Sequence, residues 1–421
     1  MRRFIPILLL ILLALSLSVA LGCYFLFLPM RAILPEEAKM WEVEKLPLNF
    51  WSSDVMPDGT TIIATERETA RVYKSVDEGK TWEFIFQIPT NLRNRACLTF
   101  CDSRGNIFVS YPAEPPETAG LWRSGDGGKT FTRVWQHSTR PEANVRFKGI
   151  TEDENGTLYF GTSVGPGGPC DIYRSVDGGK TWARISSIPG GKHIHALQYN
   201  PYNGWFYAVV GDPGYGANGL WRSKDGCLTW EKFTNLGTDP YTGKDWDIMS
   251  VGFYKDYVYL AIHWSRGQVL RLRDSDNLAA PVEEVFRSNL QLQNWVQLYQ
   301  WGGRFFMLTG GERSLSARYP VGVWASGSPP FDAGTWFEVY LDGANTGSRG
   351  TACVSHKVSK NGWIFIANSF EGRGLRIRYR GPQSPQPSHA PPQLTSNVYV
   401  QLPSQAPIYP HGKVPKATHS R

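Results

Sequence analysis

Two histidines separated by one residue form the most chemically suggestive pair in the sequence. His193 and His195 flank Ile194 in a segment expected to be a strand, and residues two apart in a strand lie on the same side of its sheet. Two such imidazoles can bind a metal ion or exchange protons. The sequence offers no third ligand at a metal-binding spacing. We therefore predict no metal site and no cofactor, and we keep both histidines as ligand-binding candidates.

Cationic side chains near other expected strands form a second group of ligand-binding candidates. Arg95, Arg146 and Arg349 come from three separate parts of the chain, and His263 follows a further expected strand. The planar fork of an arginine suits a carboxylate or another anion. Alternatively, these arginines neutralise neighbouring acidic side chains in a crowded fold.

Four carboxylates are candidates for catalysis: Asp212, Asp247, Glu312 and Glu371. A pair of carboxylates with different protonation states is what cleavage of a glycosidic bond requires. The sequence does not give their separations, and a structural role for each of them is the alternative.

An internal repeat predicts the elements that position these residues. Four eight-residue segments share one pattern, and the aspartates Asp77, Asp126, Asp177 and Asp225 follow one another at steps of 49, 51 and 48 residues. The segments are Ser75–Trp82, Ser124–Phe131, Ser175–Trp182 and Ser223–Trp230. Regular recurrence at about fifty residues is typical of repeat architectures.

Turn chemistry explains the residue types in this pattern. Serine and aspartate side chains accept hydrogen bonds from nearby backbone N–H groups and thereby close a turn. Glycine adopts positive φ at little cost, and the final aromatic residue begins a strand and buries a large apolar area. We therefore assign the four aspartates a structural role.

The four segments resemble the Asp-box, or BNR, repeat of sialidase-like β-propellers, and related repeats occur in sortilin-type receptors and photosystem II assembly factors. The resemblance extends over Trp41–Arg380 and implies an all-β propeller whose acidic turns lie opposite its main ligand face. The arginines, histidines and carboxylates named above would then lie at that ligand face. The Arg-Ile-Pro motif of sialidases is absent, which speaks against sialidase activity.

Further strand patterns between and after the turns predict seven four-stranded blades, with six as the alternative. The segment Met40–Val43 resembles a strand that follows an acidic turn. We expect it to complete the last blade and close the ring, which protects the sheet edges.

Composition fits this fold and limits the partners. The chain of 421 residues has 43 glycines, 29 prolines and 13% aromatic residues, and its net charge is +7. No dense lysine and arginine stripe is present, so we predict no nucleic-acid partner. The six cysteines show no metal-binding spacing and no disulfide framework, and we expect Cys97 and Cys101 to be buried.

Three regions are expected. Residues 1–34 contain the uncharged run Phe4–Leu28 after Arg2 and Arg3, which predicts a transmembrane signal anchor with a cytoplasmic N-terminus. A cleaved signal peptide and a lipoprotein signal ending at Cys23 are the alternatives. Residues 35–381 form the propeller outside the cytoplasm, and residues 382–421 form a proline-rich disordered tail.

Three functions are consistent with this organisation. The first is a membrane-anchored propeller that binds a glycan, peptide or protein on its central face, without a catalytic role. Trp51, Trp246, Trp264, Trp295 and Trp301 would supply aromatic surface there. The second is a glycan-active enzyme, either a sialidase-like hydrolase or a lyase. The third is an envelope assembly scaffold with no small ligand.

Overall fold

The computed structural model describes residues 40–380 with internal gaps. The gaps are 67, 94–96, 115–116, 118, 141–142, 147, 164–167, 213, 215, 235, 239–242, 244, 263–267, 288–296, 302–303, 310–321, 327–335, 342–353 and 368–373. The predicted anchor and the proline-rich tail therefore lie outside the described residues. Within the described part, no helix has the length and apolar character needed to cross a membrane.

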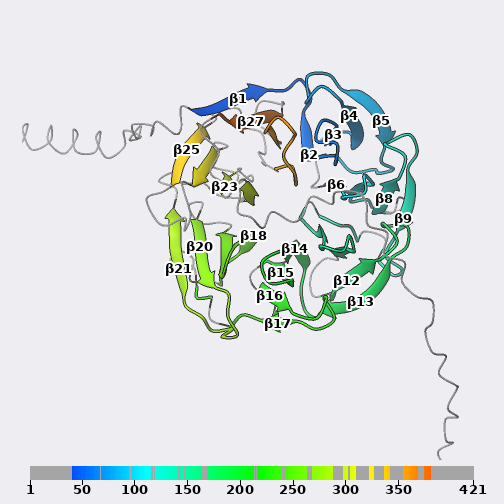
Figure 1. Ribbon diagram of the computed structural model, residues 1–421. Helices are drawn as coiled ribbons and strands as arrows, with labels where there is room; N and C mark the ends of the chain where they lie inside the picture. Colours follow the sequence, from blue (N-terminus) through cyan, green and yellow to red (C-terminus); the bar gives the residue numbers. More distant parts are fainter. Residues whose placement is uncertain are drawn as a thin grey trace, which may run out of the picture.

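The described residues form an all-β propeller whose sheets are arranged around a circle (Figure 1). Each of six sheets contains four antiparallel strands that follow one another along the chain. In Figure 1 the first strand of a sheet, such as β2, β6, β14 or β18, lies toward the centre, and the last, such as β5, β13 or β21, lies at the rim.

The bounds of these strands follow chain order. The first three sheets contain β2 (Phe50–Val55), β3 (Ile62–Glu66), β4 (Arg71–Ser75) and β5 (Glu83–Gln87); β6 (Leu98–Cys101), β7 (Ile107–Tyr111), β8 (Gly120–Ser124) and β9 (Thr132–Trp135); and β10 (Ile150–Glu152), β11 (Leu158–Gly161), β12 (Cys170–Ser175) and β13 (Ala183–Ile188). The next three contain β14 (His193–Asn200), β15 (Trp205–Gly211), β16 (Gly219–Ser223) and β17 (Glu231–Lys232); β18 (Ile248–Tyr254), β19 (Tyr257–Ile262), β20 (Gln268–Arg273) and β21 (Val282–Arg287); and β22 (Gln297–Trp301), β23 (Arg304–Thr309), β24 (Gly322–Ser326) and β25 (Trp336–Leu341).

A seventh sheet joins the two ends of the described chain. It has three strands in the order β1 (Trp41–Lys45), β27 (Leu375–Tyr379) and β26 (Ile364–Ile366). The expected pairing of the N-terminal strand with the last sheet is confirmed, since Trp41 pairs with Tyr379 and Lys45 with Leu375. Figure 1 shows β1 at the rim beside β27. This pairing closes the circle and covers a sheet edge.

An ion pair to a buried aspartate adds a second connection across the closure. The Nζ atom of Lys357 lies 3.1 Å from Oδ2 of Asp54, and Asp54 is fully buried. The same ammonium group donates to the carbonyl of Cys101. Because Asp54 belongs to β2 and Cys101 to β6, one lysine that precedes β26 contacts the first two blades.

The four acidic turns have one hydrogen-bond pattern. In each turn, Oδ1 of the aspartate accepts from the serine hydroxyl at 2.7–2.8 Å and from the threonine backbone N–H at 2.9–3.0 Å. Oδ2 accepts from the threonine hydroxyl at 2.6–2.7 Å. Both carboxylate oxygens of each aspartate therefore accept hydrogen bonds within its own turn.

The aromatic residues that end these turns pack in the core. Trp82 lies 6.2 Å from Phe50, and Trp182 lies 6.3 Å from Phe108, measured between ring centroids. The first pair joins the turn to the first strand of the same blade, and the second joins a turn to the second strand of the preceding blade, so Trp182 connects two neighbouring blades. The expected burial of Cys97 and Cys101 is also confirmed, and both are free thiols.

Candidate ligand-binding site

Antiparallel strand order places several of the candidate residues at one face of the ring. The start of a first strand, the connection from second to third strand and the approach to the next first strand all lie at the same end of the strands. For the fourth blade these segments are the start of β14, the β15–β16 connection and the residues before β18. The acidic turns connect third to fourth strands and therefore lie at the opposite face.

A β-bulge places the two histidines at the start of β14. His193 pairs with Gly211 and Ile194 with Val210, but Ala196 pairs with Val209, so His195 is the extra residue of the bulge. Bulges redirect side chains and are common beside functional sites. The His195 ring packs directly on Gly211, where an added Cβ would lie 2.0 Å from the imidazole. Glycine at this position is required by the position of the ring.

His193, His195 and Asp212 form a compact group that we call the histidine cluster. The two Nε2 atoms are 2.7 Å apart, and Oδ1 of Asp212 lies 3.3 Å from one and 3.4 Å from the other. The side chains of His193 and His195 are 4% and 2% exposed, whereas the Asp212 side chain is 29% exposed. The group is therefore enclosed by protein on the histidine side and reaches solvent on the aspartate side.

Electrostatics favours neutral His193 beside an ionised aspartate. Burial, with the nearby charge of Arg146, lowers the pKa of His193 well below its usual range. Burial alone would raise the pKa of Asp212, but its contacts with the imidazoles of His193 and His195 outweigh burial and lower that pKa below its usual range. The Lys192 ammonium also pairs with Oδ2 of Asp212. The ionised carboxylate of Asp212 is therefore the favoured form near neutral pH.

The other nitrogen of His195 has partners of its own. Its Nδ1 lies 2.7 Å from the carbonyl oxygen of Ile248, which requires a donated proton at Nδ1. Oδ1 of Asp247, a buried carboxylate, is 3.9 Å from the same nitrogen. Asp212 and Asp247 therefore stand at opposite nitrogens of one imidazole.

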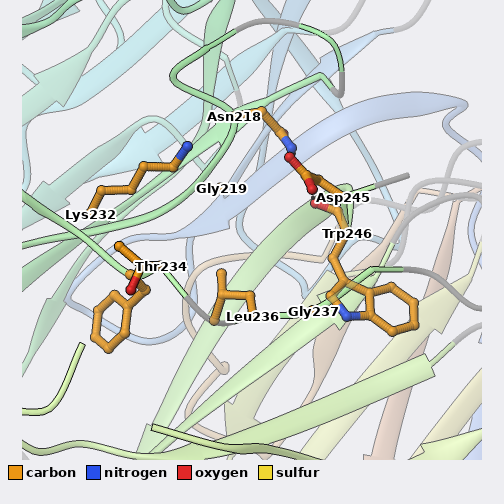
Figure 2. A pocket seen from close by; sticks show the side chains of 9 residues that line it. Asn218, Gly219, Lys232, Thr234, Leu236, Gly237, Asp245 and Trp246 are labelled. Carbon is orange, nitrogen blue, oxygen red and sulfur yellow. Dashed lines mark hydrogen bonds between the residues drawn. The ribbon is translucent and has the colours of Figure 1, made fainter. Parts of the chain in front are cut away.

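A pocket of about 220 Å³ is lined by residues that flank β16 and β17 and by the two residues that precede Asp247 (Figure 2). We call it the Trp246 pocket; its lining includes Asn218, Lys232, Leu236, Asp245 and Trp246. Figure 2 shows Asn218 and Asp245 on one side, Lys232 on the other and the Trp246 indole at one end. The Trp246–Asp247 step connects this pocket to the residues that contact His195.

One atom of the pocket is a buried acceptor. The Asn218 side chain is only 3% exposed, and its Oδ1 has no hydrogen-bond partner among the described residues. Its amide nitrogen lies 3.4 Å from the Trp246 carbonyl, which fixes the orientation of the group. An unsatisfied buried acceptor costs about 1–3 kcal/mol. The oxygen has almost no accessible surface, so a ligand hydroxyl or amine would recover that energy only after a small shift of the pocket wall.

The structure brings part of the predicted site together. Arg146, His193 and His195 lie close to one another, and the carboxylates Asp212 and Asp247 join them. Arg146 also donates from Nε to the Ser163 hydroxyl at 3.2 Å. The remaining predicted residues lie outside the described residues: Arg95, His263, Glu312, Arg349 and Glu371.

Of the five tryptophans predicted at the ligand face, two are among the residues whose side chains the structure describes. Trp51 is 6% exposed and belongs to the core, and Trp246 lines the pocket. Trp264 and Trp295 lie outside the described residues, as does the side chain of Trp301. Asn218 and Lys232 were not predicted, because only the fold brings the β16 start and the β17 end beside Asp245.

Comparison with known proteins finds carbohydrate-active relatives. The chain is 26% identical over 260 residues to a xyloglucanase of Acetivibrio thermocellus, covering 55% of this chain and 29% of the relative. It is also 26% identical over 245 residues to a xyloglucanase of Hypocrea jecorina, covering 50% of this chain and 29% of that protein. The chain thus spans less than a third of these relatives. No family model matches it.

Solved structures share the fold. A GH74 xyloglucanase from Xanthomonas campestris superposes with a TM-score of 0.55 at 13% identity, covering 82% of this chain and 55% of that chain. The structure titled YCF48 bound to D1 peptide has a TM-score of 0.51 at 17% identity and covers 81% and 97% of the two chains. At these identities the likeness concerns the propeller fold alone.

Proposed function

We propose that this chain is a membrane-anchored, extracytoplasmic propeller that binds a neutral glycan of the xyloglucan type at the face containing the Trp246 pocket. The observation that carries the proposal is the composition of this pocket. An indole, a carboxylate, an ammonium group and a buried amide oxygen surround one small space. Hydroxyl groups of a sugar can donate to the oxygens and accept from the ammonium, while its C–H surface packs on aromatic carbon.

The size and the relatives narrow the ligand class. A volume of about 220 Å³ is below the roughly 300–1,000 Å³ of pockets for drug-sized ligands, so it suits one sugar unit of a longer chain. The curated relatives named above are xyloglucanases. Xyloglucan oligosaccharides are therefore the first ligands to test, with peptide and protein partners as the alternative.

Binding of xyloglucan oligosaccharides to the full-length protein, measured by calorimetry, tests this proposal. Lys232→Met and Asn218→Leu should each weaken binding about tenfold, the effect of losing roughly 1.4 kcal/mol of hydrogen bonding. Lys129→Met is the matched control, because Lys129 lies in an acidic turn at the opposite face. Wild-type protein that binds no xyloglucan, or variants that bind it as well as wild type, would refute the assignment.

Glycan cleavage is the second candidate function, and the two carboxylates around His195 favour it. Asp212 is held as an anion and could activate a water molecule or attack a sugar carbon, whereas glycoside cleavage also needs a protonated acid. Asp247 is the described carboxylate nearest to His195 after Asp212. Release of reducing sugar from xyloglucan by wild type but not by Asp212→Asn would establish hydrolysis, and binding without release would leave the binding function alone.

The membrane anchor belongs to the same proposal. It is supported by the uncharged run Phe4–Leu28 and by Arg2 and Arg3 before it, because positive residues stay on the cytoplasmic side. In intact cells, added protease should digest the propeller, and alkaline carbonate should leave the chain in the membrane. Protection from protease, or release by carbonate, would contradict the proposed topology.

We further propose that the turns are Asp-box repeats and that the three-stranded sheet counts as the seventh blade. The uniform hydrogen bonds of Asp77, Asp126, Asp177 and Asp225 support the first assignment. A bridge between Val354 and Ile366 supports the second, because it lies where a fourth, inner strand would pair. An experimental structure with only six sheets would disprove the blade count.

A further inference from the structure

We propose that the histidine cluster is a binding site for one divalent transition-metal ion, zinc being the best match, with His193, His195 and Asp212 as its protein ligands. These residues each offer a ligand atom, and the three atoms lie within 4.8 Å of one another. Imidazole nitrogen and carboxylate oxygen are ordinary zinc ligands. The proposal replaces the sequence-based expectation of no metal, which depended on the lack of a third ligand. It does not depend on glycan binding.

Distances in the cluster approach those of a tetrahedral site. With metal–ligand bonds of about 2.0–2.1 Å, the edges of a tetrahedron are roughly 3.3–3.4 Å. Two of the three edges, from Oδ1 of Asp212 to the two Nε2 atoms, are 3.3 and 3.4 Å. The third edge, between the Nε2 atoms, is 2.7 Å. Metal binding therefore requires the two imidazoles to separate by about 0.6 Å and leaves the other edges unchanged.

The partners behind the ligands fix their orientation. Because His195 donates from Nδ1 to the Ile248 carbonyl at 2.7 Å, its Nε2 carries the lone pair in the neutral ring. Histidine ligands typically make such a bond from their other nitrogen. Lys192 pairs with Oδ2 of Asp212 and leaves Oδ1 directed at the histidines. Gly211 and the bulge hold the His195 ring in position.

Burial indicates the type of metal site. The histidines are enclosed and the aspartate side is partly open, so a fourth position is accessible to water or to a ligand. Three protein ligands with an open fourth position are the pattern of sites that bind or activate a small molecule, unlike closed structural zinc sites. The positive charges of Arg146 and Lys192 weaken cation binding. Arg146→Ala should therefore tighten zinc binding. If the cluster bound an anion instead, the same substitution would weaken binding of that anion.

Metal binding to the full-length, chelator-treated protein tests the site. Zinc titration by calorimetry should give one strong site per chain. His195→Gln and Asp212→Asn should each weaken it by at least about 100-fold, and Arg146→Ala should strengthen it. The matched control is His137→Gln, which alters another buried histidine 3.4 Å from an aspartate oxygen but in a pair with no second imidazole. This control should bind zinc like wild type.

A measurement on wild type alone guards against variants that fail to fold. X-ray absorption of the zinc-loaded protein should contain scattering from two imidazoles and one or more oxygen ligands. Fewer than two imidazoles, no tight zinc, or equal affinity in Asp212→Asn and wild type would overturn the proposal. In that case one proton shared between the two imidazoles and Asp212 accounts for the cluster. Failure of zinc binding would leave the glycan proposal standing, because the two use different readouts.

Discussion

The two faces of the ring come from opposite ends of the same strands, but their residues are organised in opposite ways. At one face, four turns repeat the same side chains and the same hydrogen bonds, and each aspartate is satisfied inside its own turn. At the other face, His193, His195, Asp212 and Trp246 have no counterpart in the neighbouring repeats.

This difference separates architecture from chemistry. A residue needed to build every blade must recur in every blade, whereas a ligand site needs an asymmetric set of groups at one place. The buried acceptor of Asn218 and the close imidazoles lie at the asymmetric face. Substitutions at the repeated face should therefore cost stability, and substitutions at the asymmetric face should cost binding.

The largest expected loss of stability is at the repeated face, with Gly179→Ala. Gly179 has a φ of 77°, and an added Cβ would lie 2.3 Å from the Phe108 ring. Backbone strain and overpacking together should lower the free energy of unfolding by about 3 kcal/mol or more. Urea denaturation measures the loss. Gly178→Ala is the control, because it has a φ of 72° but a nearest contact of 3.3 Å, and an equal loss there would contradict the packing argument.

At the asymmetric face, Gly211→Ala should cost binding most. The new methyl group would displace the His195 ring and break the geometry of the histidine cluster. Zinc affinity should fall by at least about 100-fold, as for loss of a ligand. Gly216→Ala is the control, because Gly216 lies in the β15–β16 connection without a positive φ and with no atom within 4 Å of the added Cβ. Unchanged zinc affinity in Gly211→Ala would show that the contact between Gly211 and the His195 ring is not needed for metal binding.

Asp177→Ala and Asp212→Ala set the two kinds of aspartate against each other. Asp177 closes a turn with bonds to Ser175 and Thr181, so its loss should lower the free energy of unfolding by about 1–2 kcal/mol and leave xyloglucan binding intact. Asp212→Ala should greatly lower the affinity for zinc and should change the free energy of unfolding much less. Denaturation and calorimetry on both variants check this, and matching losses of both properties would erase the distinction.

The smallest expected effect is the pH dependence of the turns. Burial alone would raise the pKa of Asp77, but hydrogen bonds from Thr81 and Ser75 outweigh burial and lower that pKa from 3.8 to about 2. A carboxyl with a depressed folded-state pKa stabilises the fold above its unfolded pKa, and this contribution is lost as pH falls toward the folded value. The melting temperature should therefore decline between about pH 4 and pH 2. The decline should be shallower in Asp77→Asn, and identical slopes in the two proteins would contradict the expectation.

The sequence predicts the repeated face well because turn chemistry is local. Ser75 and Asp77 are two residues apart, and their contact depends on no distant segment. The closing strand could also be predicted from the sequence, because the pattern of Met40–Val43 matches strands found elsewhere in the repeat. Periodicity also placed the two histidines on one strand.

The composition of the candidate site depends on contacts that the sequence does not encode locally. Asp212 reaches the histidines through the pairing of β14 with β15, and Asp247 does so from the next blade. The bulge at His195 changes the register by one residue, which no alternation of polar and apolar residues reveals. The place of Asn218 in the pocket could not be predicted from the sequence, because an acceptor is unsatisfied only by virtue of the atoms that surround it in the fold.

Hydrogen exchange of the full-length protein with and without a xyloglucan oligosaccharide tests the division between the two faces most directly. Ligand should slow exchange in peptides containing the β15–β16 connection and the residues leading into β18, while exchange at the four acidic turns stays unchanged. Protection centred on Asp77, Asp126, Asp177 and Asp225, with none around Asp212 and Trp246, would contradict the account.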